Sequence, residues 1–193
     1  MLQQLIDGLK SKGLYPLHPI KDIEHSCCQS QKEVIDFDAV KDAYYSQIGP
    51  PQRTPKSCDA LLILPEENKI IFGEMKDMDK LINRFTAEQD FYPTVDDLSN
   101  KIRNKFRPDK KLFDSLFLLL EIAHYCALED NFFSFLMSQD CTIQCHFIMK
   151  LTGRQLAILG TLLSSERAYY KYHKIGHIDF VTSDAFDQIL DEL

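Results

Sequence analysis

Two short, largely apolar runs separated by a polar connection constrain the fold of this chain more than any other feature. Residues 60–64 (Ala-Leu-Leu-Ile-Leu) and 69–72 (Lys-Ile-Ile-Phe) flank Pro65-Glu-Glu-Asn68. This is the pattern of a β-hairpin with a four-residue loop. Both faces of each run are apolar, so we expect the hairpin to lie inside a sheet that is covered on both sides.

The rest of the chain supplies candidate helices and further strands for such a sheet. Leu2, Leu5, Ile6 and Leu9 have helical spacing. The residues after the hairpin, through Tyr92 and Pro93, are expected to form a mixed loop. Periodicity predicts helices at 30–48, at 94–123 with a restart at Pro108, at 154–170 and at 184–193, and strands at 142–151 and 177–182. This order predicts an α/β fold with a mixed central sheet flanked by helices.

Composition limits the classes of protein to which the chain could belong. With 193 residues, 45% hydrophobic content and no Pro/Gly/Ser-rich linker, residues 1–193 are expected to form a single domain. The amino terminus lacks the pattern of a secretory signal, and the longest apolar run ends at Glu121, so we expect a cytoplasmic protein with no membrane span. A net charge of −7 opposes bulk coating of nucleic acid but leaves room for a local basic surface.

The hairpin brings three charged residues onto one face. Opposed residues of an antiparallel pair have a constant sum of residue numbers, and Leu64 opposite Lys69 gives 133. Asp59 and Glu74 have the same sum, so their Cβ atoms should lie roughly 5 Å apart. Lys76 lies on the face of Glu74, roughly 7 Å further along the strand.

This arrangement suits a divalent cation. Two neighbouring carboxylates repel each other unless one is protonated or a cation lies between them, and Mg²⁺ accepts one or two carboxylates together with water and phosphate oxygens. The alternative is that the three residues are ordinary polar strand ends. Glu67-Asn-Lys69 and Asp109-Lys-Lys111 have the same acid-to-lysine spacing, so the hairpin context alone distinguishes Glu74-Met-Lys76.

Residues 30–151 resemble the core of the PD-(D/E)XK nuclease superfamily, in which a helix precedes a hairpin that bears the motif. The resemblance implies that Asp59 and Glu74 bind Mg²⁺ or Mn²⁺ and that Lys76 orients or activates the attacking water. Cys58 replaces the usual proline before the aspartate, and residues 49–57 leave little room for the preceding strand. The implied fold is therefore a restriction-endonuclease-like core with the first strand short or missing.

Members of this superfamily often contribute a further acidic residue from the first helix. Glu33 is the candidate here, because it precedes Phe37 by one helical turn and so borders the apolar stripe. Asp36 and Asp38 are competing candidates, and either could instead cap the helix.

A basic segment provides a candidate surface for nucleic acid. Lys101, Arg103, Lys105 and Arg107 form two pairs with one-turn spacing, which could contact a phosphate backbone or form a solvated helix face. Together these features predict a metal-dependent endonuclease that hydrolyses phosphodiester bonds in DNA or RNA. The alternatives are a different metal-dependent hydrolase and a non-catalytic, nuclease-like scaffold, such as an immunity or effector protein, that binds a protein partner or forms a homodimer.

Overall fold

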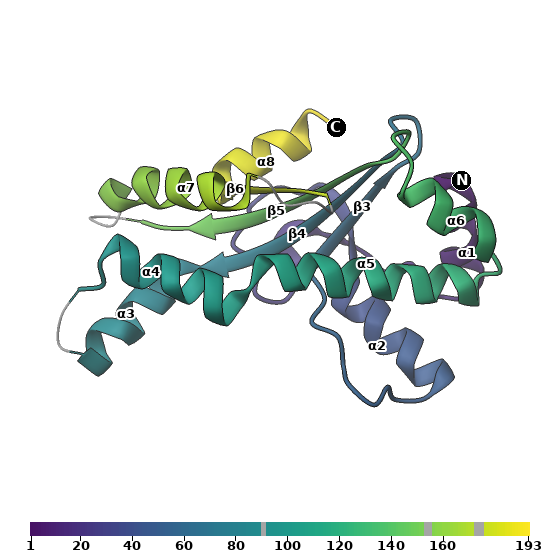
Figure 1. Ribbon diagram of the computed structural model, residues 1–193, viewed down its shortest axis with the longest axis horizontal. Helices are drawn as coiled ribbons and strands as arrows, with labels where there is room; N and C mark the ends of the chain where they lie inside the picture. The colour runs from purple at the N-terminus through teal and green to yellow at the C-terminus, as the bar shows by residue number, and fades with distance from the viewer. Residues whose placement is uncertain (90–91, 153–155, 172–175) are drawn as a thin grey trace.

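A mixed six-stranded sheet forms the centre of the molecule (Figure 1). The computed structural model describes residues 1–89, 92–152, 156–171 and 176–193. The strands lie side by side in chain order, and their bounds are β1 (Leu17–Pro19), β2 (Glu33–Asp36), β3 (Ala60–Leu64), β4 (Lys69–Asp77), β5 (Thr142–Lys150) and β6 (His177–Thr182). The pairs from β1 to β4 are antiparallel, and β5 and β6 continue the sheet in parallel. The predicted α/β class and mixed sheet are confirmed.

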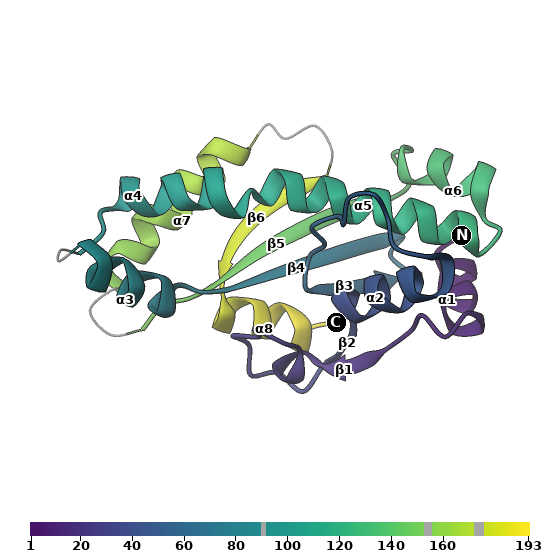
Figure 2. The same cartoon turned by 90° about the horizontal axis from the view of Figure 1, so that it is seen from below.

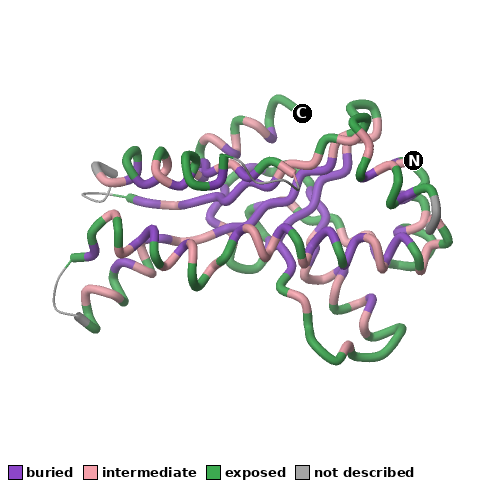
Figure 3. Tube along the Cα trace, viewed as in Figure 1, coloured by how far each residue is buried: buried purple, intermediate pink, exposed green. Residues whose placement is uncertain are grey.

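The hairpin has the predicted register. Leu64 pairs with Lys69 and Ala60 with Gly73, and the Asp59 backbone N–H extends the ladder by donating to the Gly73 carbonyl at 2.9 Å. Side chains of β3 and β4 are buried on both faces, as expected for a hairpin inside a covered sheet. Figure 3 shows the continuous burial of these central strands.

Helices cover the two faces of the sheet unequally (Figure 2). The larger apolar cluster joins one face to residues of α1 (Leu2–Ser11), α2 (Phe37–Ile48), α5 (Pro108–Tyr125), α6 (Glu129–Leu136) and α7 (Leu156–Tyr170). On the opposite face, α8 (Ser183–Asp191) and the segment after β1 enclose a smaller cluster around Phe186. No helix within the described ranges is long and apolar enough to cross a bilayer.

The predicted helix at 30–48 is wrong in its first part. Residues 33–36 form strand β2, which pairs with β1 and, through Ile35 and Asp36, with β3. The β-branched pair Val34-Ile35 is buried in the sheet, and this tertiary pairing outweighs the helical spacing. Helix α2 begins at Phe37, where Asp36 is the N-cap and accepts a hydrogen bond from the Ala39 N–H at 2.9 Å.

Two helices were absent from the predicted order. Helix α3 (Met78–Gln89) replaces most of the expected loop after the hairpin, and α6 follows α5. Elsewhere the bounds of α1, β5, β6, α7 and α8 agree with the predicted elements to within a few residues; the expected start of the helix at 154 lies outside the described residues.

The basic segment adopts an interrupted helix. Thr94 and Asp97 form a capping box that opens α4 (Val95–Lys101). A π-helical turn, η2 (Ile102–Phe106), follows, and Arg107 adopts a left-handed conformation with φ 51° before Pro108 starts α5. The expected restart at Pro108 is confirmed.

Candidate active site

The hairpin places Asp59 and Glu74 on the same face of the sheet. Asp59 immediately precedes β3 and lies opposite Glu74 in the register that pairs Ala60 with Gly73. Both side chains are buried: Asp59 is 5% exposed and Glu74 is 0% exposed. The Met75 backbone N–H donates to Asp59 Oδ2 at 2.6 Å, which fixes the aspartate against β4.

Two lysines from different elements neutralise Glu74. Lys111 Nζ, from the first turns of α5, donates to Glu74 Oε2 at 2.7 Å. Lys76 Nζ lies 2.5 Å from Oε1, yet Oε1 accepts no hydrogen bond with regular geometry from any described residue, and Nζ donates to the Met75 carbonyl at 3.0 Å. Two lysines therefore balance the negative charge of Glu74, while its buried Oε1 lacks a hydrogen bond of regular geometry.

The electrostatics of Asp59 reflect its burial. Removal from water raises the pKa of this carboxyl, and the negative charge of Glu74 raises it further, to about 7, against the opposing effects of Lys76, Lys111 and the Met75 N–H. Burial lowers the pKa of the Lys111 ammonium, but Glu74 and Asp59 more than offset this effect and leave the pKa above its ordinary value. Near neutral pH the site therefore holds a proton that it can release.

Sequence reasoning did not place Lys111 beside Glu74. It lies 37 positions after Glu74 in the chain, and helix packing alone brings it to the hairpin. A local signal existed: Lys111 directly precedes Leu112, the first residue of the α5 stripe that includes Leu116 and Leu119. A lysine that borders a buried stripe can extend its ammonium past the apolar surface.

An open cleft of about 570 Å³ leads to this site. Its lining includes five lysines, one carboxylate and one aromatic side chain: Asp38, Lys41, Lys56, Lys76, Lys105, Phe106 and Lys111, together with Thr54, Pro55 and Ser57. At its side, Lys41 Nζ lies 2.5 Å from Asp38 Oδ1 and 3.0 Å from Ser57 Oγ. The carboxylates Asp59 and Glu74 are not part of the lining; they lie behind Lys76 and Lys111, which contact Glu74.

The structure does not bring Glu33 to this cluster. Glu33 is an exposed residue of β2 that pairs with Pro19, three residues before the point where Asp36 pairs with Ala60. The helical placement on which its selection depended is wrong, for the reason given above. Of its two competitors, Asp36 caps α2 and Asp38 lines the cleft.

The four basic residues of the interrupted helix have different environments. Lys105 lines the cleft, whereas Lys101 lies 6.0 Å from the ring centre of Phe85. Arg103 makes two hydrogen bonds to Glu166 of α7, at 2.8 and 3.2 Å, and Glu166 has no exposed surface. Arg107 Nη2 lies 3.8 Å from Asp109. Only Lys105 therefore belongs to the cleft.

Asp59 and Glu74 offer carboxylate oxygens, which are ligands of the kind that a hard divalent cation accepts. Their opposed carboxylates repel each other. Glu74 Oε1 has Lys76 Nζ at 2.5 Å but no hydrogen bond of regular geometry, so it is the Glu74 oxygen that a cation would contact. Across the described ranges, no group of three or more histidine, cysteine or acidic residues has the arrangement of a metal site. A bound Mg²⁺ would therefore complete its shell with water and phosphate oxygens.

Comparisons with known proteins add no family to this picture. No family model, no curated protein and no solved structure among those compared matches the chain.

Proposed function

We propose that this protein is a metal-dependent nuclease that hydrolyses phosphodiester bonds in DNA or RNA. The observation that carries the proposal is the fully buried Glu74, which lies opposite Asp59 and contacts Lys76 and Lys111 at the base of a lysine-lined cleft. A buried carboxyl with a raised pKa beside a cleft, as found for Asp59, is typical of functional sites. The surrounding ammonium groups give the site the charge that a phosphodiester requires.

The chemistry follows from the groups present. Asp59 and Glu74 would hold Mg²⁺ or Mn²⁺, which when bound polarises a phosphate ester and makes a water more acidic. Lys76 and Lys111 would stabilise the charge that develops on the phosphate, because both ammoniums are partly exposed toward the cleft. Lys76 would also orient the attacking water. In the site without a cation the pKa of Asp59 is about 7, so binding of the cation would displace its proton.

A cleavage assay tests this proposal. Plasmid and single-stranded substrates are incubated with the protein in Mg²⁺ or Mn²⁺, and then with chelator. Asp59→Asn and Lys76→Ala are expected to lower cleavage at least about 100-fold. The matched control is Glu67→Gln with Lys69→Ala, an ion pair with the same sequence spacing at the opposite end of β4. Cleavage that survives in chelator, or that falls equally in the control, contradicts the proposal.

An exposed apolar surface favours a second candidate function, that of a protein-interaction scaffold. Phe113 and Phe117 of α5 are 51% and 56% exposed, and Phe133 and Met137, in and just after α6, are 55% and 63% exposed. They border an apolar groove of about 220 Å³. Exposed apolar groups gathered in this way are typical of interaction sites.

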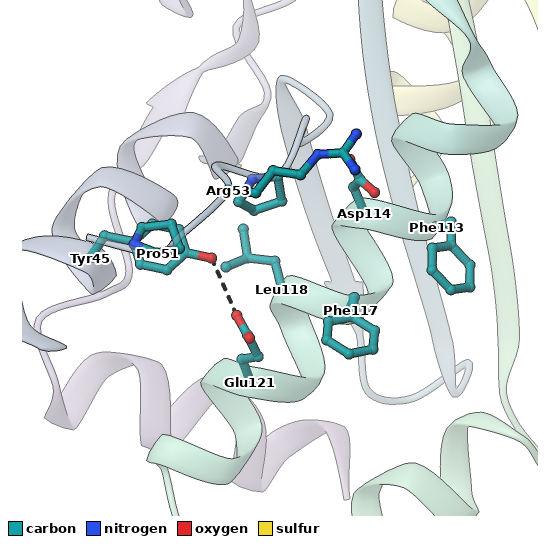
Figure 4. Close-up of a pocket in the computed structure, with 9 residues that line it drawn as sticks. Tyr45, Pro51, Arg53, Phe113, Asp114, Phe117, Leu118 and Glu121 are labelled. Atoms are coloured by element: carbon teal, nitrogen blue, oxygen red, sulfur yellow. Dashed lines mark hydrogen bonds between the residues drawn. The ribbon is translucent and has the colours of Figure 1, made fainter. Parts of the chain in front are cut away.

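A second pocket, of about 270 Å³, shares Phe113 and Phe117 with this groove. Figure 4 shows Tyr45 at its rim, donating to Glu121 at 3.2 Å, with Phe113 and Phe117 on the same helix as Glu121. Titration calorimetry distinguishes the two functions. Binding of Mg²⁺ that requires Asp59 supports the nuclease, whereas absence of metal binding together with absence of cleavage of any polymer supports the scaffold.

A further inference from the structure

Two lysines in the cleft have no ion-pair partner among the described residues. Lys41 pairs with Asp38, and Lys76 and Lys111 pair with Glu74. Lys56, in the loop after α2, and Lys105, in η2, are exposed and make no ion pair with any residue that the structure describes. In a chain of net charge −7, the two ammoniums leave the cleft with excess positive charge beside the candidate active site.

The size of the cleft limits what can enter it. A compact space of 570 Å³ is about 10 Å across if it is spherical, which is too small for the cross-section of a duplex, whose major groove alone is about 12 Å wide. The volume is in the range of sites that enclose a single small molecule. Glu74 and Asp59 lie behind the lining lysines and are almost completely buried, so a scissile phosphate has to enter the cleft to come near them.

Phe106 places an aromatic ring among these lysines. It lines the cleft beside Lys105, and Lys76 Nζ lies 5.6 Å from its ring centre. The ring packs on Phe147 of β5, with centroids 6.1 Å apart, which holds it in place. A positively charged groove combined with an aromatic side chain is the arrangement with which proteins bind single strands, since cations contact the backbone and bases stack on the ring.

We propose that the cleft binds single-stranded nucleic acid, with Lys56 and Lys105 on the phosphates that flank the scissile one and Phe106 against a base. This inference rests on the proposed nuclease function and names its substrate class. A flexible strand can place one or two nucleotides inside the cleft, whereas a duplex keeps its phosphates on a wide, stiff rod. Lys56 and Lys105 belong to separate segments, so a strand that lies between them can contact both.

Fluorescence anisotropy in chelator tests the inference without cleavage. The probes are labelled oligonucleotides of 12 nucleotides: single-stranded DNA, single-stranded RNA, the DNA duplex of the same sequence, and a fully abasic DNA of the same length. The variant is Lys56→Gln with Lys105→Gln. The matched control is Lys21→Gln with Lys32→Gln, two exposed lysines with the same charge change near β1. Thermal melting of each variant verifies that it is folded.

Single strands are expected to bind more tightly than the duplex and the abasic probe. Removing two phosphate contacts should weaken single-strand binding about 25-fold at 0.1 M salt and reduce the salt slope by about 1.4, with no comparable loss in the control. Equal or tighter duplex binding, equal losses in both variants, or no binding of any probe would overturn the inference. Selective binding of single strands without cleavage in Mg²⁺ would support single-strand binding by the cleft and contradict only the nuclease proposal. Cleavage that is selective for duplex would support the nuclease proposal and contradict single-strand binding by the cleft.

Discussion

Replacing Asp59 with asparagine is expected to stabilise the fold above neutral pH while it removes the proposed nuclease activity. The carboxyl is 5% exposed, and burial followed by repulsion from Glu74 raises its pKa from 3.8 to about 7. Asparagine keeps the size of the side chain and an oxygen for the Met75 N–H, but it never ionises. The wild-type protein therefore bears an electrostatic cost at alkaline pH that the variant lacks.

The sign and size of this cost follow from proton linkage. Between pH 3.8 and about 7 the folded state keeps a proton on Asp59 that the unfolded state has released. The stabilisation is therefore complete below the unfolded pKa and is lost as the pH rises through the folded pKa. The difference between 3.8 and about 7 corresponds to about 4 kcal/mol in the free energy of unfolding.

Urea unfolding at pH 5 and pH 8 measures this effect in the wild type, in Asp59→Asn and in the control Asp140→Asn. Asp140 is exposed in the turn before β5. The stability gap between Asp59→Asn and the wild type should widen by about 2–3 kcal/mol from pH 5 to pH 8, and contributions from other titrating groups cancel in the difference. A gap that does not change with pH would refute the reasoning about burial and repulsion.

Magnesium extends the same experiment. Because a cation between the carboxylates would relieve their repulsion, Mg²⁺ at 100 times its Kd should stabilise the wild type at pH 8 by about 2.7 kcal/mol. Asp59→Asn should show no such gain, and chelator should reverse it in the wild type. Equal stabilisation of both proteins would place the cation elsewhere.

Three further predictions follow from buried charges. Lys111→Met should lower the free energy of unfolding by about 3 kcal/mol because it removes a buried ion-pair partner of Glu74. The control Lys80→Met, which removes an exposed ion pair with Asp77, should lower it by less than about 1 kcal/mol in the same urea titration. Arg103→Ala should cost about 3–5 kcal/mol because Glu166 has no exposed surface, and the salt slope of oligonucleotide binding should not change. Burial lowers the pKa of His146 to about 4, so the wild type should lose about 3 kcal/mol of stability relative to His146→Leu as the pH drops from 6.5 to 4. The opposite contribution of Asp59 cancels in this difference.

Much of the hairpin could be predicted from the sequence because its determinants are local. The four-residue connection sets the register, and the alternation of side chains along a strand then places Asp59, Glu74 and Lys76 on one face. The capping box at Thr94 and the helix start at Pro108 are local in the same way. Each depends on the chain within a few residues, where steric and hydrogen-bonding preferences are encoded directly.

The strand at 33–36 shows where local reasoning fails. Its residues continue a helical spacing into α2, yet the buried Val34 and Ile35 complete the sheet beside β3. The strand is stabilised by pairing with residues 60–61, which lie more than 20 positions further along the chain. A prediction from neighbouring residues does not include this pairing. The placement of Glu33 was wrong for the same reason.

By itself, then, the sequence determined the hairpin, its register and the shared face of two carboxylates and a lysine. Only the tertiary structure decided that Lys111 joins Glu74, that Arg103 turns toward Glu166, and that Lys56 and Lys105 line one cleft. Alternation along a strand is a property of the backbone and can be counted along the chain. The choice of partner for a long cationic side chain depends instead on which helix packs against which strand, and this is fixed by burial of the whole apolar core.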